Sequence, residues 1–249
     1  MKQDKGFLNA LDDWGSVLTG TYENATITHE VIPSENIHGE LVVPVYYAYN
    51  MQNYKHETIE GHVYIPEGVT EIQFTAFTDC EDITNVSMSD TLKVIGEKAF
   101  MNCTKLREVA IPDAVEHIQK SAFTKCKSLK NVKLPKQLKL IDNYAFNDCD
   151  LQGELVIPEG VIIIGDQTFS LNTNLTSLKL NSNLTQIKNL AFYGCSSLSG
   201  ELVIPETVKY IGLFAFVDTN IDKIYVPKDN VKDWDKDWNN RCPAEIVYY

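Results

Sequence analysis

The sequence has no apolar run approaching the roughly 18 residues that a membrane-spanning helix needs. Its N-terminus, Met-Lys-Gln-Asp-Lys-Gly, also lacks the apolar core and small-residue cleavage site of a signal peptide. We therefore expect either an intracellular protein or a chain that starts after a removed export signal, with a Met added. The residues alone favour neither.

Positive charge is scarce, since 22 Lys and Arg residues stand against 34 Asp and Glu, a net charge of −12. Nucleic-acid backbones and anionic membrane surfaces both require a basic patch, so we expect neither as a partner. Hydrophobic residues at 44% and charged residues at 22% are typical of globular proteins. The composition therefore predicts a folded, acidic protein.

The sequence also lacks the short motifs that mark most catalytic and cofactor sites. It has no Gly-x-Ser-x-Gly elbow, no phosphate-binding glycine-rich loop and no Cys-x-x-Cys spacing. No two histidines form the His-Glu-x-x-His motif of a zinc hydrolase. We interpret all five as scattered surface residues: His29, His38, His56, His62 and His117. We expect no catalytic residue, no cofactor and no metal site, and hence no enzyme.

One acidic stretch resembles the start of a calcium loop, because Asp233, Asp235 and Asp237 alternate along the chain. A calcium loop of this type needs Gly at its sixth position and a bidentate Glu at its twelfth. Trp238 and Ala244 occupy these positions. The stretch therefore does not fit a calcium site.

What the sequence does contain is a repeated dipeptide, Ala-Phe, which Thr-Phe replaces once. Its Phe residues are 23 residues apart, with a last interval of 24: Phe77, Phe100, Phe123, Phe146, Phe169, Phe192 and Phe216. Three residues after each Phe stands a small side chain: Cys80, Cys103, Cys126, Cys149, Asn172, Cys195 or Thr219. A self-similar period in the twenties is typical of a solenoid, in which each repeat forms one coil.

The unit at residues 129–149 illustrates the expected fold of one coil. Val132 and Leu134 alternate with polar residues, which predicts a short strand with these two side chains inward. The proline that follows ends the strand, and Leu138 and Ile141 predict a second, short extended piece. We interpret the Ala-Phe-x-x-Cys segment as a single helical turn, stable only because Phe and Cys pack against neighbouring coils.

The repeat divides the chain into segments. Residues 61–217 carry seven repeats, and residues 38–60 are interpreted as an N-terminal capping coil because terminal repeats are usually atypical. Residues 1–37 do not carry the repeat. Their apolar residues recur at helical spacing, which predicts a short amphipathic helix: Phe7, Leu8, Leu11, Trp14 and Leu18.

Residues 218–249 are expected to close the array with a last strand, Ile224-Tyr225-Val226-Pro227, and a C-terminal cap. In the cap, Val231, Trp234 and Trp238 fall on one face of a predicted amphipathic helix. An edge strand is expected to follow. Together the helix and the edge strand would cover the final coil.

The cysteine column bears on redox chemistry. Neighbouring coils lie about 4.8 Å apart, which is within the Cα range of a disulfide. Side chains stacked in parallel, however, do not bring their Cβ atoms to the required separation of about 3.8 Å. The column also accepts Asn172 and Thr219, so we expect a buried ladder of reduced thiols. Cys242 lies outside the column and has no assigned role.

The pattern Leu-x-x-Val-x-Leu-Pro-x-x-Leu-x-x-Ile-x-x-x-Ala-Phe-x-x-Cys resembles the leucine-rich repeat of the BspA type, found in surface proteins of gut and oral anaerobic bacteria. The resemblance covers residues 38–247, with small departures: Met88-Ser89 and Leu180-Asn181 lack the proline, and Thr168 replaces Ala. It implies a curved right-handed superhelix of short parallel β-strands, with short helical turns and second short strands on the other side. It also implies an exported protein, secreted or at the cell surface, that acts in adhesion or host-protein binding, and it carries over no catalytic residue.

The outward positions of the repeated strand form a candidate protein-binding face, because a solenoid presents them as one extended surface. Six residues are selected as candidates: Tyr64, His62, Lys133, Val156, Lys179 and Tyr225. The expected partner is a protein or a glycan, such as a component of the host extracellular matrix. The alternative is a solvated sheet whose Val and Tyr follow strand propensity. The chain would then be a structural spacer without a ligand of its own.

Overall fold

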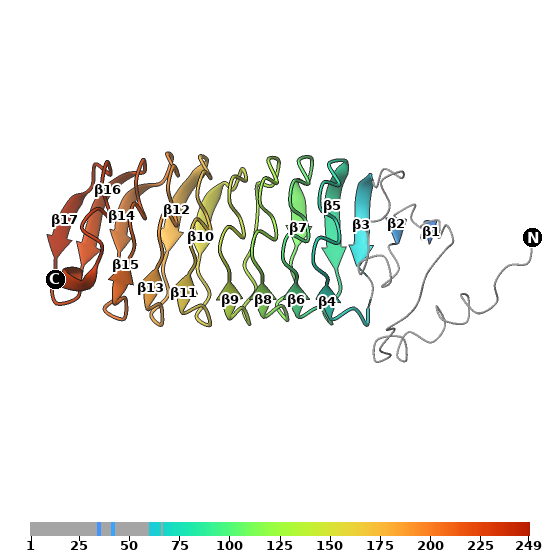
Figure 1. Ribbon diagram of the computed structural model, residues 1–249, viewed down its shortest axis with the longest axis horizontal. Helices are drawn as coiled ribbons and strands as arrows, with labels where there is room; N and C mark the ends of the chain where they lie inside the picture. The colour runs from blue at the N-terminus through green and yellow to red at the C-terminus, as the bar shows by residue number, and fades with distance from the viewer. Residues whose placement is uncertain (1–33, 36–40, 43–59, 66) are drawn as a thin grey trace, which may run out of the picture.

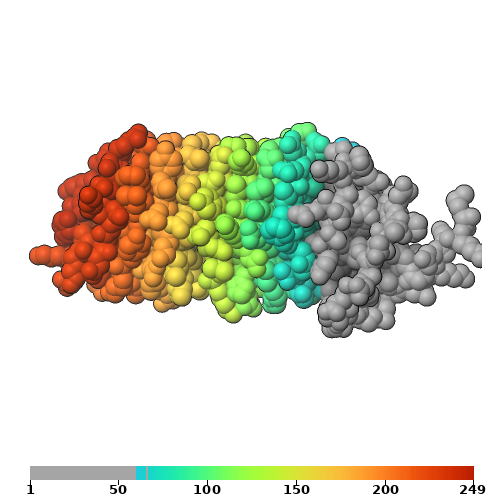
Figure 2. Space-filling model, viewed as in Figure 1, coloured from blue at the N-terminus to red at the C-terminus, as the bar shows by residue number. Residues whose placement is uncertain are grey.

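The computed structural model describes residues 34–35, 41–42, 60–65 and 67–249. The helix expected within residues 1–37 and most of the capping coil expected at 38–60 lie outside these residues. The described chain is a parallel β-solenoid, as the 23-residue period predicts (Figure 1). Its coils follow one another in sequence order along the long axis (Figure 2).

The strands form two rows on different sides of the solenoid, and most coils contribute one strand to each (Figure 1). All strand pairings are parallel except that of β1 with β2. We call the first row the main row: β1 (Ser34–Glu35), β2 (Leu41–Val42), β3 (Gly61–Ile65), β5 (Ile83–Met88), β7 (Glu108–Ala110), β10 (Gly153–Val156), β12 (Leu175–Lys179), β14 (Ser199–Val203), β16 (Asn220–Val226) and β17 (Glu245–Tyr248).

The second row is one continuous parallel sheet of two-residue strands. Its strands are β4 (Glu71–Ile72), β6 (Val94–Ile95), β8 (His117–Ile118), β9 (Leu140–Ile141), β11 (Ile163–Ile164), β13 (Gln186–Ile187) and β15 (Tyr210–Ile211). In each strand the second residue is a buried isoleucine. This regular alternation places one apolar residue per coil in the core.

The phenylalanines of the repeat form the centre of the core. All seven, from Phe77 to Phe216, are fully buried. Rings from consecutive coils stack nearly parallel, with centroids between 5.0 and 5.7 Å apart. This spacing is close to the distance of about 4.8 Å between neighbouring strands. The repeat period therefore sets the register of the rings as well as that of the strands.

The Ala-Phe-x-x-Cys segments are not helical turns, so this expectation was wrong. In the segment around Phe123, Ser121 and Lys125 have left-handed backbones, with φ of 57° and 63°. Such residues interrupt an α-helix. The N–H of Phe123 donates to the carbonyl oxygen of Ala145 in the next coil, at 2.8 Å, instead of to its own coil. The segment therefore combines tight turns with a hydrogen-bond ladder between coils.

The strand expected around Val132 and Leu134 does not form a ladder. In this coil the bridge from Glu108 to Asn131 is the only pairing that the described residues show in the main row. The main row is thereby divided into separate sheets, one ending at β7 and the next beginning at β10. A further break lies between β12 and β14. We call residues 132–134 the break segment.

A glycine with a left-handed backbone stands at the start of the strand that follows each break. Gly153 has φ of 74° and Gly200 has φ of 80°. In both strands the pairing register shifts directly after the glycine. A bulge of this kind bends the strand and disrupts the local ladder. The same glycine and register shift occur in β3, which pairs with both β2 and β5, so the bulge by itself does not cause a break.

The C-terminal cap differs from the expected amphipathic helix. The only helix among the described residues is the 3-10 helix η2 (Val231–Asp233), and tight turns follow it. Trp234 and Trp238 are nevertheless buried. The ring of Trp238 meets that of Phe216 edge-on, with centroids 6.0 Å apart. Two aromatic side chains in turns therefore close the end of the core.

Candidate binding surface

The cysteines of the column pack inside the core and bind to backbone carbonyl groups there. The thiols of Cys103, Cys126, Cys149 and Cys195 each donate to the carbonyl oxygen of the Phe in the preceding coil, at 3.0 to 3.2 Å. Burial raises the pKa of the Cys195 thiol to about 12, and burial together with the nearby Asp79 carboxylate raises that of Cys80 to about 11. Thiols with such pKa values are poor nucleophiles at neutral pH.

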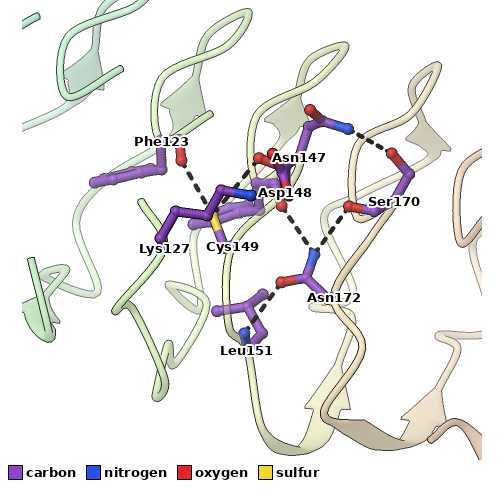
Figure 3. A network of polar contacts seen from close by, with 9 residues as sticks. Phe123, Lys127, Asn147, Asp148, Cys149, Leu151, Ser170 and Asn172 are labelled. Carbon is purple, nitrogen blue, oxygen red and sulfur yellow. Dashed lines mark hydrogen bonds and ion pairs between the residues drawn. The ribbon is translucent and has the colours of Figure 1, made fainter. Parts of the chain in front are cut away.

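Asn172 replaces cysteine once in this column and makes more contacts than a thiol can (Figure 3). Its amide nitrogen donates to the carbonyl oxygens of Phe146 and Phe169, at 2.9 and 2.8 Å. Its amide oxygen accepts from the N–H of Leu151, at 3.1 Å. The side chain is fully buried. Asn172 therefore connects its own coil to the one before it.

Cys242, which had no assigned role, continues the same column. Its sulfur lies 3.3 Å from the hydroxyl oxygen of Thr219, the column member of the preceding coil. Arg241 beside it has a left-handed backbone and pairs with Asp218 at 2.8 Å. The cap thus reproduces part of a coil. The place of Cys242 in the column could have been predicted from the sequence, because Cys242 follows Thr219 by 23 residues, the period of the repeat.

The outward side chains of the main row lie in register across consecutive strands, and we call this surface the strand face. Val156 pairs with Lys179, and Tyr225 pairs with Val203 and Val247. At the other end of the array, His62 and Tyr64 lie on β3, and the imidazole of His62 is 2.7 Å from the Ser87 hydroxyl. Lys133 lies in the break segment. The six candidates share one face but do not form one cluster.

Two aliphatic side chains dominate the C-terminal half of the strand face. Val156 is 51% exposed and Val203 is 56% exposed, values that are unusual for Val in a sheet. Between them lies Lys179, whose ammonium pairs with Glu154 at 3.0 Å. Val203 was missing from the six candidates, although its outward position could be read from the repeat. The exposed surface here therefore holds two valines with an ion pair between them, and the exposed Glu201 lies on the same strand as Val203.

A second apolar patch lies on the second row, where sequence reasoning placed none. Leu140 is 40% exposed and Ile162 is 52% exposed. In the coils on either side, the positions of Ile162 hold Lys139 and Thr185. The signal available in the sequence was an Ile in a column that is otherwise polar.

The described residues contain no group of three or more His, Cys, Asp or Glu side chains that could hold a metal ion. None of the helices among them is long and apolar enough to cross a membrane. Asp233, Asp235 and Asp237 lie in the cap, where the N–H of Asp237 donates to the carboxylate of Asp235 at 2.9 Å. The feature of the described chain that best suits recognition is therefore the strand face.

Comparison with known families decides the identity of the repeat. The model of the BspA type leucine rich repeat region matches residues 50–172 and 128–244, in six copies. The chain belongs to this family. The resemblance inferred from the consensus is confirmed, and the leucine-rich repeats account for most of the chain.

Solved structures agree with this assignment. A leucine-rich repeat protein from Bacteroides ovatus is 31% identical, with a TM-score of 0.55, over 72% of this chain and 57% of its own. A leucine-rich repeat protein of T. pallidum is 30% identical, with a TM-score of 0.57, over 63% of this chain and 75% of its own. The chain thus spans little more than half the length of the Bacteroides protein. A comparison with curated proteins gives no match.

Proposed function

We propose that this leucine-rich-repeat protein is a non-enzymatic binding protein, secreted or displayed at the cell surface, that uses its strand face to bind a protein or glycan. The observation that carries the proposal is the pair of exposed valines, Val156 and Val203, held in register on consecutive sheets. Exposed aliphatic side chains that lie in line on a rigid surface favour association, because their burial releases water.

The solenoid supports such a role through its rigidity. Its outward side chains sit on backbone ladders, and its core is a continuous column of stacked rings. Preorganised side chains lose little conformational freedom on binding, which improves affinity for a given contact area. The family to which the chain belongs supports the surface location, since repeats of the BspA type are found in surface proteins of bacteria.

A binding assay against purified matrix proteins and mucins tests the proposal. The test variant carries Tyr64→Glu, Lys133→Glu and Lys179→Glu, and a second carries Val156→Glu and Val203→Glu. The matched control is Ile162→Glu, because Ile162 is as exposed as the valines but lies on the second row. We expect at least about tenfold weaker binding for the valine variant and unchanged binding for the control.

The opposite pattern would contradict the assignment of the face. Binding that survives both face variants but disappears with Ile162→Glu would move the site to the second row. A wild-type chain that binds no member of the panel favours the alternative, a structural spacer. Circular dichroism of each variant shows whether the solenoid remains folded.

A further inference from the structure

Three exposed cationic residues lie at the main row in two consecutive coils: Arg107 directly before β7, Lys130 at the equivalent place in the next coil, and Lys133 in the break segment. Arg107 and Lys130 occupy equivalent places, because the N–H of Lys130 donates to the carbonyl oxygen of Arg107 at 3.4 Å. Lys133 follows three residues later in the same coil as Lys130. All three are exposed. Within the described residues none of them has a carboxylate close enough for an ion pair.

Other lysines in the same part of the array are paired between neighbouring coils. The pairs are Lys105 with Asp82, Lys127 with Asp148, Lys136 with Asp113 and Lys139 with Glu116. The carboxylate of Glu108, adjacent to Arg107 in sequence, accepts a hydrogen bond from the amide of Asn85 at 3.5 Å. Arg107, Lys130 and Lys133, all outside any ion pair among the described residues, thus outnumber the Glu108 carboxylate beside them, on a chain whose net charge is −12. We call these three residues the cation cluster.

The cation cluster coincides with the break in the main row. Apart from the bridge between Glu108 and Asn131, no described backbone–backbone hydrogen bond involves Val132, Lys133 or Leu134. Val132 is also only half-buried, whereas Val109 and Leu155 at the equivalent positions are buried. Backbone polar groups outside a ladder take water or a ligand as partner. The break segment thus adds unpaired backbone groups beside three cations.

Two exposed valines lie beyond the cation cluster on the strand face. Val156 lies one coil after Lys133 and is 51% exposed. Val203, two coils further along, is 56% exposed. Lys179 between them is neutralised by Glu154. A ligand that follows the strand face from the cation cluster toward the C-terminus therefore meets positive charge first and aliphatic side chains next.

We infer that the strand face binds a polypeptide segment whose acidic residues contact Arg107, Lys130 and Lys133 and whose apolar residues cover Val156 and Val203. This inference rests on the proposed function and names the chemistry of the partner. A long polyanion fits less well. It would continue along the main row onto exposed carboxylates that form no ion pair within the described chain, such as that of Glu201, and like charges repel. A short acidic run followed by apolar residues matches both regions.

The test uses the full chain and a fluorescently labelled peptide in which a run of glutamates precedes a run of valines. Binding is measured by fluorescence anisotropy against wild type and against Arg107→Glu, Lys130→Glu and Lys133→Glu combined. The matched control combines Lys93→Glu, Lys120→Glu and Lys236→Glu, which changes the net charge equally at exposed lysines outside the cluster. A scrambled peptide of the same composition, a valine peptide without glutamates and an acidic oligosaccharide are competitors.

We expect the cluster variant to bind the labelled peptide at least about tenfold more weakly than wild type, and the control variant to bind like wild type. Binding should also weaken as salt is raised, because the contacts are charged. Equal binding by the cluster and control variants, or no binding by wild type, overturns the inference. So does stronger competition by the scrambled peptide or the oligosaccharide.

The proposed function is tested separately, by measuring how the variant with Val156→Glu and Val203→Glu binds the purified matrix proteins and mucins. If Val156→Glu with Val203→Glu abolishes panel binding while the cluster variant leaves it intact, the strand face is the binding surface and the acidic-segment inference is wrong.

Discussion

The rings of Phe123 and Phe146 stack in consecutive coils, with centroids 5.1 Å apart and planes inclined by 7°. Both side chains are fully buried, and the same relationship repeats along the array. Aromatic stacking adds to the burial of each ring. Because each Phe contacts one before and one after it, a coil depends on its neighbours for its stability, as in other repeat proteins.

Phe123→Ala should destabilise the solenoid by about 3–5 kcal/mol, because it removes a fully buried ring and leaves a cavity between Phe100 and Phe146. Phe123→Leu should be milder, since it retains most of the apolar volume. Guanidinium unfolding followed by circular dichroism measures both. Ile162→Ala, at a half-exposed site, is the control. An unchanged unfolding midpoint for Phe123→Ala would contradict the conclusion that the stacked Phe residues stabilise the solenoid.

Asn172→Leu should lower stability by more than about 2 kcal/mol, because the N–H of Leu151 and two carbonyl oxygens lose their buried partner. Asn172→Cys should lose less. A thiol at this position can donate to Phe146 as Cys149 donates to Phe123, although it does not replace the acceptor for Leu151. Thermal unfolding of the two variants separates the contributions. If both variants melted at the temperature of wild type, the amide hydrogen bonds of Asn172 would contribute little to stability.

The buried thiols should make stability depend on pH in the alkaline range. The pKa of Cys195 is raised from 9.0 to about 12, so the native state keeps the proton that the unfolded state releases. The stabilisation from this group is therefore complete below pH 9.0 and is lost as pH rises toward about 12. Unfolding free energies of wild type and Cys195→Ser between pH 7 and 11 measure it. We expect wild type to show the steeper decline, and parallel curves would refute the prediction.

Leu171→Asn should stabilise the chain by about 0.5–1 kcal/mol, because Leu171 has a left-handed backbone with φ of 62°. Asn tolerates this conformation better than Leu, and Asn102 and Gly194 already occupy equivalent places with φ of 63° and 71°. Ile162→Asn removes a similarly exposed aliphatic side chain outside that conformation and serves as the control. If the melting temperature rose for both variants, the cause would be the loss of an exposed aliphatic side chain and not the backbone conformation of Leu171.

The periodic columns of the sequence predicted the solenoid, the buried Phe and Cys, and the outward register of the strand face. They did so because each column repeats one local environment, so a residue type recurs wherever the environment recurs. The helical turns were wrong because the Ala-Phe-x-x-Cys pattern was read without the residue before Cys, although that column holds Asp79, Asn102, Asp148 and Gly194, types that tolerate a left-handed backbone.

The amino-acid sequence by itself determined the fold class, since a 23-residue period with one buried Phe per unit can bury its apolar residues only by stacking coils. The tertiary structure decided which surface residues are available for binding. Lys133 and Lys136 lie three residues apart in the same repeat, yet within the described chain only Lys136 forms an ion pair, with Asp113 at 2.6 Å. Such pairings depend on which side chains meet between neighbouring coils, and the break segment is defined by the ladder that it does not form with β7 or β10. Both are relationships between coils, which a single repeat does not contain.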